Sequence, residues 1–123
     1  MTRVIKVRGT GEAMSGGMLG PIDGEALPYR AEIAPLGTQS YSASVAQCRA
    51  ALRAVDAQGE SWVGTAYSLG AAALGDYVML DRPKHCLGIV LLADPLRARG
   101  QCANPVPADR WGVAGERRIS GIP

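Results

Sequence analysis

The chain has 123 residues, of which 47% are hydrophobic and 20% charged, and its formal net charge is +2. This is the length and composition of one globular domain, so residues 1–123 are expected to form a single domain rather than several or a disordered chain. The small net charge does not indicate a nucleic-acid partner. No apolar run approaches the ~20 residues of a membrane span, and the first residues lack the apolar stretch of a signal peptide. We expect a protein made in the cytoplasm without export.

The three cysteines, Cys48, Cys86 and Cys102, show no CxxC spacing and no metal-ligand pattern. We therefore expect no metal and no cofactor. Free thiols are favoured, and one disulfide stays open as an alternative. Aromatic residues make up only 5% of the chain and phenylalanine is absent, so the core is expected to be aliphatic.

Apolar patterns predict the elements of the first half. Arg3–Arg8 is a short β-branched run that predicts a strand, and the Gly-rich stretch after it predicts a long loop. Tyr29–Ala34 predicts a second, weaker strand. Ser44–Asp56 predicts a helix, because apolar residues recur there at steps of three and four. Ser44 and Gln47 have the spacing of a capping box at its start.

In the second half, strands alternate with a helix. Ser61–Ala66 predicts a strand, and Leu69–Leu80, which is small and apolar almost throughout, predicts a helix packed on a sheet. Cys86–Ala93 is apolar without alternation and predicts a strand buried on both faces. This order of elements predicts an open parallel α/β sheet, and residues 94–123 predict an irregular tail.

The strand predicted to end at Ala66 runs into Ser68, and a helix of small residues follows. This is the context of a Gly-x-Ser-x-Gly nucleophile elbow, whose sharp turn needs small residues two before and two after the serine. Ala66 and Gly70 meet that need, although alanine replaces the first glycine. The amide of Leu69 would donate to a developing oxyanion. The alternative is an ordinary strand–helix turn that Ser68 caps.

Five segments follow one another in the order and spacing of cutinases: Arg8-Gly9-Thr10-Gly11-Glu12, Tyr41–Ala46, Ala66–Ala71, Gly75-Asp76 and Ala93-Asp94-Pro95. The sequence resembles the cutinase-like α/β-hydrolases, and at Asp94–Arg97 it also looks like the mycobacteriophage lysin B esterases. The resemblance implies a three-layer α/β sandwich around a short parallel sheet of about four strands. It further implies that Ser68 is the nucleophile of a serine esterase and that Thr10 and Leu69 form the oxyanion hole through their backbone amides.

A serine nucleophile needs a base and an acid that orients the base, which follow the serine in α/β-hydrolases. The only histidine, His85, precedes the last predicted strand. We therefore expect it at the sheet edge opposite Ser68, about 20 Å away, where it cannot be the base. Of the carboxylates that follow Ser68, Asp76 and Asp81 belong to the predicted helix and its end, and the resemblance implies a structural role for Asp94. Asp109 and Glu116 lie in the tail and have no histidine to orient. The resemblance puts the acid and the histidine after the matched segments, so the hydrolase domain is expected to be C-terminally incomplete.

Three hypotheses about function remain. The chain is a catalytically silent esterase descendant that serves as a structural or interaction protein, for example in a phage virion. Alternatively, it is an active serine esterase on lipid esters of the mycolyl type, with acid and base supplied by a partner chain. In the third hypothesis Ser68 keeps residual activity through the oxyanion hole alone. A sheet without its last strand exposes an apolar edge, so a homo-oligomer or a tight partner protein is expected in each case.

Two further clusters have alternative explanations. Positive charge gathers in the last third of the chain at Arg97, Arg99, Arg110, Arg117 and Arg118. Solvated loop charge or an interface with an acidic partner is favoured over a phosphate site, because no aromatic residues interleave as nucleic-acid stacking would need. Met14, Met18 and Leu19 either line an acyl-binding cleft or pack the loop that carries them.

Overall fold

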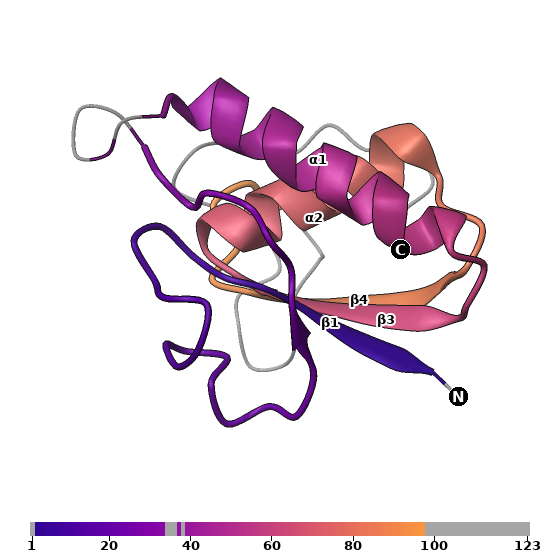
Figure 1. Cartoon of the computed structure of the whole chain (residues 1–123). Helices are drawn as coiled ribbons and strands as arrows, with labels where there is room; N and C mark the ends of the chain where they lie inside the picture. Colours follow the sequence, from indigo (N-terminus) through magenta and orange to yellow (C-terminus); the bar gives the residue numbers. More distant parts are fainter. Residues whose placement is uncertain (1, 34–36, 38, 98–123) are drawn as a thin grey trace.

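The computed structural model describes residues 2–33, 37 and 39–97, which form one sheet and two helices (Figure 1). The elements are β1 (Arg3–Val7), β2 (Glu25–Ala26), α1 (Tyr41–Ala57), β3 (Trp62–Tyr67), α2 (Leu69–Asp81) and β4 (Cys86–Leu92). The four described strands lie in the order β2-β1-β3-β4, and every neighbouring pair is parallel. The predicted parallel α/β sheet is therefore confirmed, as are both helices and the strands β1, β3 and β4.

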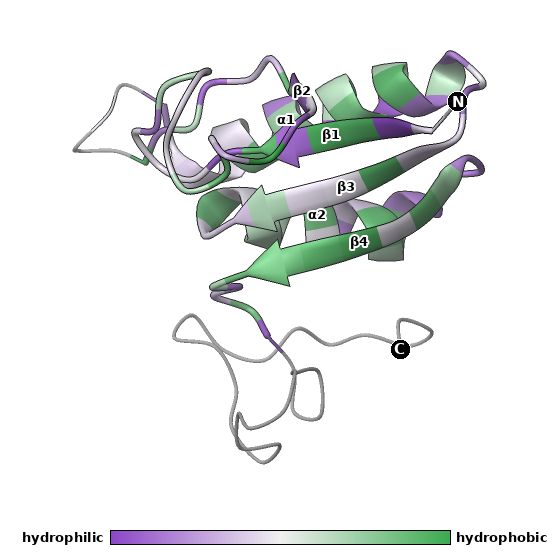
Figure 2. Ribbon diagram, turned by 90° about the horizontal axis from the view of Figure 1, so that it is seen from below, coloured by the Kyte–Doolittle hydropathy of each residue, from purple (hydrophilic) through white to green (hydrophobic). Residues whose placement is uncertain are grey.

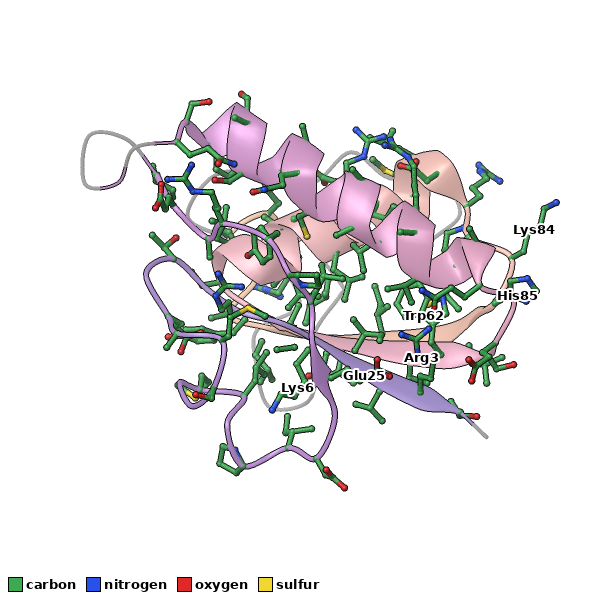
Figure 3. The ribbon with its side chains drawn as sticks, viewed as in Figure 1. Arg3, Lys6, Glu25, Trp62, Lys84 and His85 are labelled. Carbon is green, nitrogen blue, oxygen red and sulfur yellow. The ribbon has the colours of Figure 1, made fainter. Side chains whose placement is uncertain are left out.

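The second strand lies earlier than predicted. It is Glu25–Ala26, held beside β1 by two hydrogen bonds of 2.8 Å from the Arg3 guanidinium to the Glu25 carboxylate (Figure 3). The prediction of a strand over Tyr29–Ala34 was wrong. Side chains in that segment do alternate into the core, but the Arg8 guanidinium, rather than a neighbouring strand, donates to the Tyr29 carbonyl oxygen. The alternation of polar and apolar side chains therefore predicted their burial correctly, but it wrongly predicted that the segment pairs with a neighbouring strand.

The first helix begins before the predicted capping box. Ser40 is its N-cap, and the Ser40 hydroxyl accepts a hydrogen bond of 3.1 Å from the amide of Ala43. Ser44 is instead buried and donates to the Glu32 carbonyl oxygen at 2.7 Å. The Gln47 side-chain oxygen accepts from the backbone of the same preceding segment. The capping-box prediction was therefore wrong, because both side chains join the helix to the chain before it.

Both helices lie on the same face of the sheet (Figure 1). The crossovers from β2 to β3 and from β3 to β4 move in the same direction along the sheet, and right-handed crossovers then place their helices on one side. The core lies between these two layers and is centred on Ile5, Val7, Trp62, Leu74 and Tyr77. The described residues thus supply two layers of the expected sandwich.

The prediction that β4 is buried on both faces was wrong. Ile89 and Leu91 pack against the core, but Leu87 is 66% and Val90 59% exposed. A register shift beside Trp62 also leaves Leu87 without a partner in the ladder. Figure 2 shows the sheet from below, with β4 forming an apolar strip at its edge. No other described strand pairs with the outer edge of β4. Neither described helix covers the face of the sheet that Figure 2 shows, since both helices lie behind it.

Candidate active site

Ser68 lies in the tight turn between β3 and α2, at the carboxyl end of the sheet. Its backbone has φ 53° and ψ −112°, a conformation that costs a residue with a side chain of order 1–3 kcal/mol. Hydrogen bonds hold it on both sides: the Ser68 amide donates to Leu92 of β4 at 2.9 Å, and its carbonyl oxygen accepts from Ala72 at 3.0 Å. The Ser68 hydroxyl makes no capping hydrogen bond with α2. The alternative of a side-chain cap is therefore not what the structure shows.

The small residues on either side of Ser68 allow the turn to pack against the end of β1. Ala66 is fully buried and is the register partner of Val7. A Cβ atom on Gly70 would lie 2.6 Å from the carbonyl oxygen of Arg8 and closer still to that of Val7. Any larger residue at position 70 would therefore push the start of α2 away from β1.

The exit from β1 approaches the same turn. A Cβ on Gly9 would lie 2.8 Å from the ring of Tyr67 and 3.1 Å from its carbonyl oxygen. Two glycines, one after each strand, thus bring the loop that begins at Gly9 against the elbow. Thr10 is the next residue of that loop, so the structure brings the predicted Thr10 position to the edge of the sheet where Ser68 lies.

The backbone amides of Thr10 and Leu69 are among those at this edge that donate to no acceptor within the described chain. In the loop after β1, the amides of Gly9, Gly11 and Glu12 are all hydrogen-bonded, to the Glu12 carboxylate, Ala31 and Gly9 respectively. Among these residues the Thr10 amide alone has no bonded acceptor in residues 2–33, 37 and 39–97. The amide of Leu69, first in α2, is likewise unbonded there, and it has the positive end of the helix dipole behind it. Unbonded amides of this kind are the donors that an oxyanion hole needs.

His85 lies at the opposite end of the sheet. Its carbonyl oxygen accepts from the first residue of β3, Trp62, at 3.0 Å, whereas Ser68 bonds to the last residue of β4. The seven residues of β4 separate the two ends by about 20 Å. Figure 3 shows His85 beside Lys84 and Trp62 at the end where the chain begins. The expectation that His85 lies far from Ser68 is thus confirmed.

Asp56 organises that distant end. Its carboxylate accepts from the Trp62 indole at 3.0 Å and from the amides of Lys84 and His85, each at 2.9 Å. Burial opposes its negative charge, but these hydrogen bonds outweigh burial and hold the pKa of Asp56 below its usual value. Asp56 thereby joins the end of α1 to β3 and to the loop before β4, which is a structural role.

The candidate acids after Ser68 have other partners or lie outside the described residues. Asp81 is bound by the guanidinium groups of Arg49 and Arg53 and joins the two helices. Asp94, at the same sheet edge as Ser68, accepts from the Leu96 amide in the turn after β4 at 3.0 Å. Asp76 is half-buried in α2. The candidate acids outside the described residues are Asp109 and Glu116.

The remaining predicted clusters are only partly described. Met14 and Met18 are 47% and 54% exposed, but Leu19 is buried in the loop packing and cannot line an open cleft. Cys48 and Cys86 are free thiols, and burial raises the pKa of Cys48 to about 12. Cys102 and the arginines after Arg97, which are Arg99, Arg110, Arg117 and Arg118, lie outside the described residues.

Residues 2–33, 37 and 39–97 contain no candidate metal site and no candidate membrane span. No group of three or more histidine, cysteine or acidic side chains there could hold a metal ion. Neither helix in this part of the chain is long and apolar enough to cross a membrane.

Arg8 and Glu12 are the residues near the site whose structural importance sequence reasoning missed. The Arg8 guanidinium donates to the carbonyl oxygens of Glu12, Leu27 and Tyr29, and it lies over the Tyr29 ring at 5.1 Å. In the sequence, Arg8 and Glu12 stood out only as the two ends of the Arg8-Gly9-Thr10-Gly11-Glu12 segment. The structure shows which groups the two side chains bind.

Comparison with solved structures gives the fold. Acetyl xylan esterase is 21% identical and has a TM-score of 0.61, over 80% of this chain and 65% of its own. Lysin B from Mycobacteriophage D29 is 19% identical with the same TM-score, over 83% of this chain and 49% of its own. No family model matches the sequence, and no curated protein matches it. The chain thus has the cutinase-like α/β-hydrolase fold, and it spans about two thirds of one of these proteins and half of the other.

Proposed function

We propose that the chain carries the nucleophile and the oxyanion hole of a serine carboxylic-ester hydrolase, and that a second polypeptide completes the site. The observation that carries the proposal is the contrast between two serines at helix starts. Ser40 precedes α1 with an extended backbone, φ −67° and ψ 159°, and caps the helix through its hydroxyl. Ser68 precedes α2 with a strained backbone and does not cap it. A serine that only began a helix would need no such strain.

The proposed chemistry follows from the groups around Ser68. The Ser68 Oγ attacks an ester carbonyl carbon while a base removes the hydroxyl proton. The amides of Thr10 and Leu69 donate hydrogen bonds that stabilise the negative charge forming on the carbonyl oxygen. Collapse of this intermediate expels the alcohol with a proton from the base. Water then hydrolyses the acyl-enzyme. The sequence holds one histidine, His85, at the wrong end of the sheet, so a histidine base must come from residues other than these 123.

The surface at β4 supports a completing polypeptide. The outer edge of this strand pairs with no other described strand, and Leu87 and Val90 on it are exposed. A strand added beside β4 would continue the parallel sheet and shield part of this apolar surface. Because Ser68 bonds to the last residue of β4, the carboxyl end of an added parallel strand would approach the nucleophile.

The proposed substrate is a lipid ester, with mycolyl-type esters as the class that the lysin B likeness suggests. Exposed Met14 and Met18 lie on the loop that begins beside the elbow, and half-exposed Leu92 ends β4 next to Ser68. These apolar side chains suit an acyl chain better than a sugar. The name of a second structural neighbour, acetyl xylan esterase, suggests a short acyl group as the alternative.

A fluorophosphonate probe tests the proposal, because it phosphonylates an activated serine. The full chain is incubated with the probe, alone and with candidate partner chains, and the modified residue is found by mass spectrometry. We expect labelling at Ser68 that a partner accelerates and that Ser68→Ala abolishes. Ser42→Ala, at an exposed serine of α1, is the matched control and should label as the wild type does.

A second candidate function is a catalytically silent structural or interaction protein, for example in a phage particle. The exposed β4 surface favours it equally, since a partner on that surface is expected whether or not chemistry occurs. Absence of labelling with every partner that binds β4, together with unchanged binding by Ser68→Ala, would support this function and contradict the esterase proposal.

A further inference from the structure

Thr10 lies between two glycines, so its own neighbours do little to fix where its amide points. Gly11 has φ 74°, which is open to glycine and unfavourable for most other residues. Contacts from elsewhere must therefore orient the Thr10 amide. One of these is the hydrogen bond of 2.7 Å from the Gly11 amide to the Ala31 carbonyl oxygen.

The other contacts come from Glu12. One oxygen of its carboxylate, Oε1, accepts from the Gly9 amide at 2.8 Å, and the second, Oε2, accepts from the Met18 amide at 2.7 Å. The Glu12 amide also donates to the Gly9 carbonyl oxygen at 3.2 Å. The peptide units on both sides of Thr10 are thus held, and the carboxylate joins the start of the loop to its far side.

Glu12 is itself held in place. The Arg8 Nε donates to the Glu12 carbonyl oxygen at 2.7 Å, while the same guanidinium binds the backbone at Leu27 and Tyr29. The Glu12 main chain is therefore anchored to the segment after β2, and its carboxylate reaches back to Gly9. Because both the main chain and the carboxylate of Glu12 are held by hydrogen bonds, Glu12 can fix the position of the neighbouring Thr10 amide.

We propose that Glu12 is a positioning residue that orients the Thr10 amide toward the oxyanion, acting through its two hydrogen bonds to Gly9 and Met18. The inference rests on the proposed function, because it assigns the Thr10 amide to the developing charge. Two acceptor oxygens are required. A glutamine can accept at only one of the two amides, since its NH₂ group donates.

The first test compares Glu12→Gln with the wild type and with Glu60→Gln, a control at an exposed glutamate before β3. We expect Glu12→Gln to slow phosphonylation of Ser68 at saturating probe about 10-fold or more, since loss of a whole oxyanion donor slows catalysis by ~100-fold or more. The probe concentration for half-maximal rate and the Tm should change little. Glu60→Gln should match the wild type. Equal labelling rates for Glu12→Gln and wild type would overturn the proposal.

A second variant displaces the carboxylate without removing it. A Cβ on Gly17 would lie 2.7 Å from Cδ of Glu12, so Gly17→Ala should slow labelling in the same way as Glu12→Gln. If Glu12→Gln does not fold, this variant decides: labelling by Gly17→Ala at the wild-type rate overturns the proposal.

Failure of the proposed function is distinguishable from failure of this inference. If the wild type is never labelled, the esterase proposal fails, and amide NMR of the same proteins tests the positioning alone. We expect Glu12→Gln to shift the Thr10 resonance and to speed hydrogen exchange at Gly9 and Met18, with the α2 resonances unchanged. A Thr10 resonance that stays in place would show that Glu12 does not position this amide.

Discussion

Substitution of Gly70 by alanine should destabilise the protein, although alanine is the better helix former. In an exposed helix the change would stabilise by about 1 kcal/mol. Here the new Cβ would lie 2.6 Å from the Arg8 carbonyl oxygen and closer to that of Val7, below the 3.0 Å that Cβ contacts respect. Both obstacles are backbone at the end of β1, so the start of α2 has to move.

Overpacking costs about 1–3 kcal/mol, and about 2–3 kcal/mol is expected here because both obstacles are backbone atoms; helix propensity offsets about 1 kcal/mol of it. We therefore expect a net loss of about 1–2 kcal/mol in the free energy of unfolding, which lowers the Tm by roughly 4–8 °C in a chain of this size. The same movement displaces Ser68 and the Leu69 amide, so labelling of Ser68 should slow more than stability alone explains.

Urea unfolding and the fluorophosphonate assay, run on the same preparations, measure both effects. Gly88→Ala is the matched control, because a Cβ on Gly88 meets nothing within 4 Å, and it should be neutral or slightly stabilising. If Gly70→Ala proved as stable as the wild type and were labelled as fast, the close packing of the elbow on β1 would be refuted.

Three further predictions concern the rest of the molecule. Asp56→Ala removes an acceptor of three hydrogen bonds and should lower the free energy of unfolding by about 2–4 kcal/mol in urea denaturation. Because the folded pKa of Asp56 lies below its unfolded value, its contribution is complete above the unfolded pKa and is lost as pH falls through the folded one. The variant should therefore lose less stability in acid than the wild type, and an equal loss would contradict this. Val90→Lys places a charge on an exposed position of β4, so it should reduce self-association or partner binding in light scattering with little change in Tm. His85→Ala should leave Ser68 labelling unchanged, and a large decrease would contradict the assigned distance between the two residues.

Patterns in the sequence predicted the sheet and both helices because burial leaves a local trace, which is periodic in α1 and uniformly apolar in α2. The errors came where a distant contact decides. The sequence spacing of Ser44 is that of a helix cap, but its hydroxyl donates a hydrogen bond to the carbonyl oxygen of Glu32, twelve residues earlier. Apolar residues throughout β4 indicated burial on two faces. Composition does not reveal whether another element covers a strand, or whether that element belongs to the same chain.

The site shows the same limit. The small residues around Ser68 predicted the elbow, and the order of the motifs predicted the fold. The contacts that hold the strained backbone of Ser68 cannot be read from residue types, because they are hydrogen bonds to Leu92 of β4 and from Ala72. The role of Glu12 likewise depends on the path of the loop to Met18.

The pairing of Val7 with Ala66 has a consequence for folding kinetics. The two halves of the proposed oxyanion hole follow these two residues, and the chain between them contains β2 and the whole of α1. Contacts so distant along the sequence form slowly, because a long loop must close before any pairing energy is gained. We therefore expect the helix α1 to form early and the elbow to acquire its geometry only in the last step of folding. Amides of α1 should accordingly gain protection from hydrogen exchange before the amide of Ser68 does.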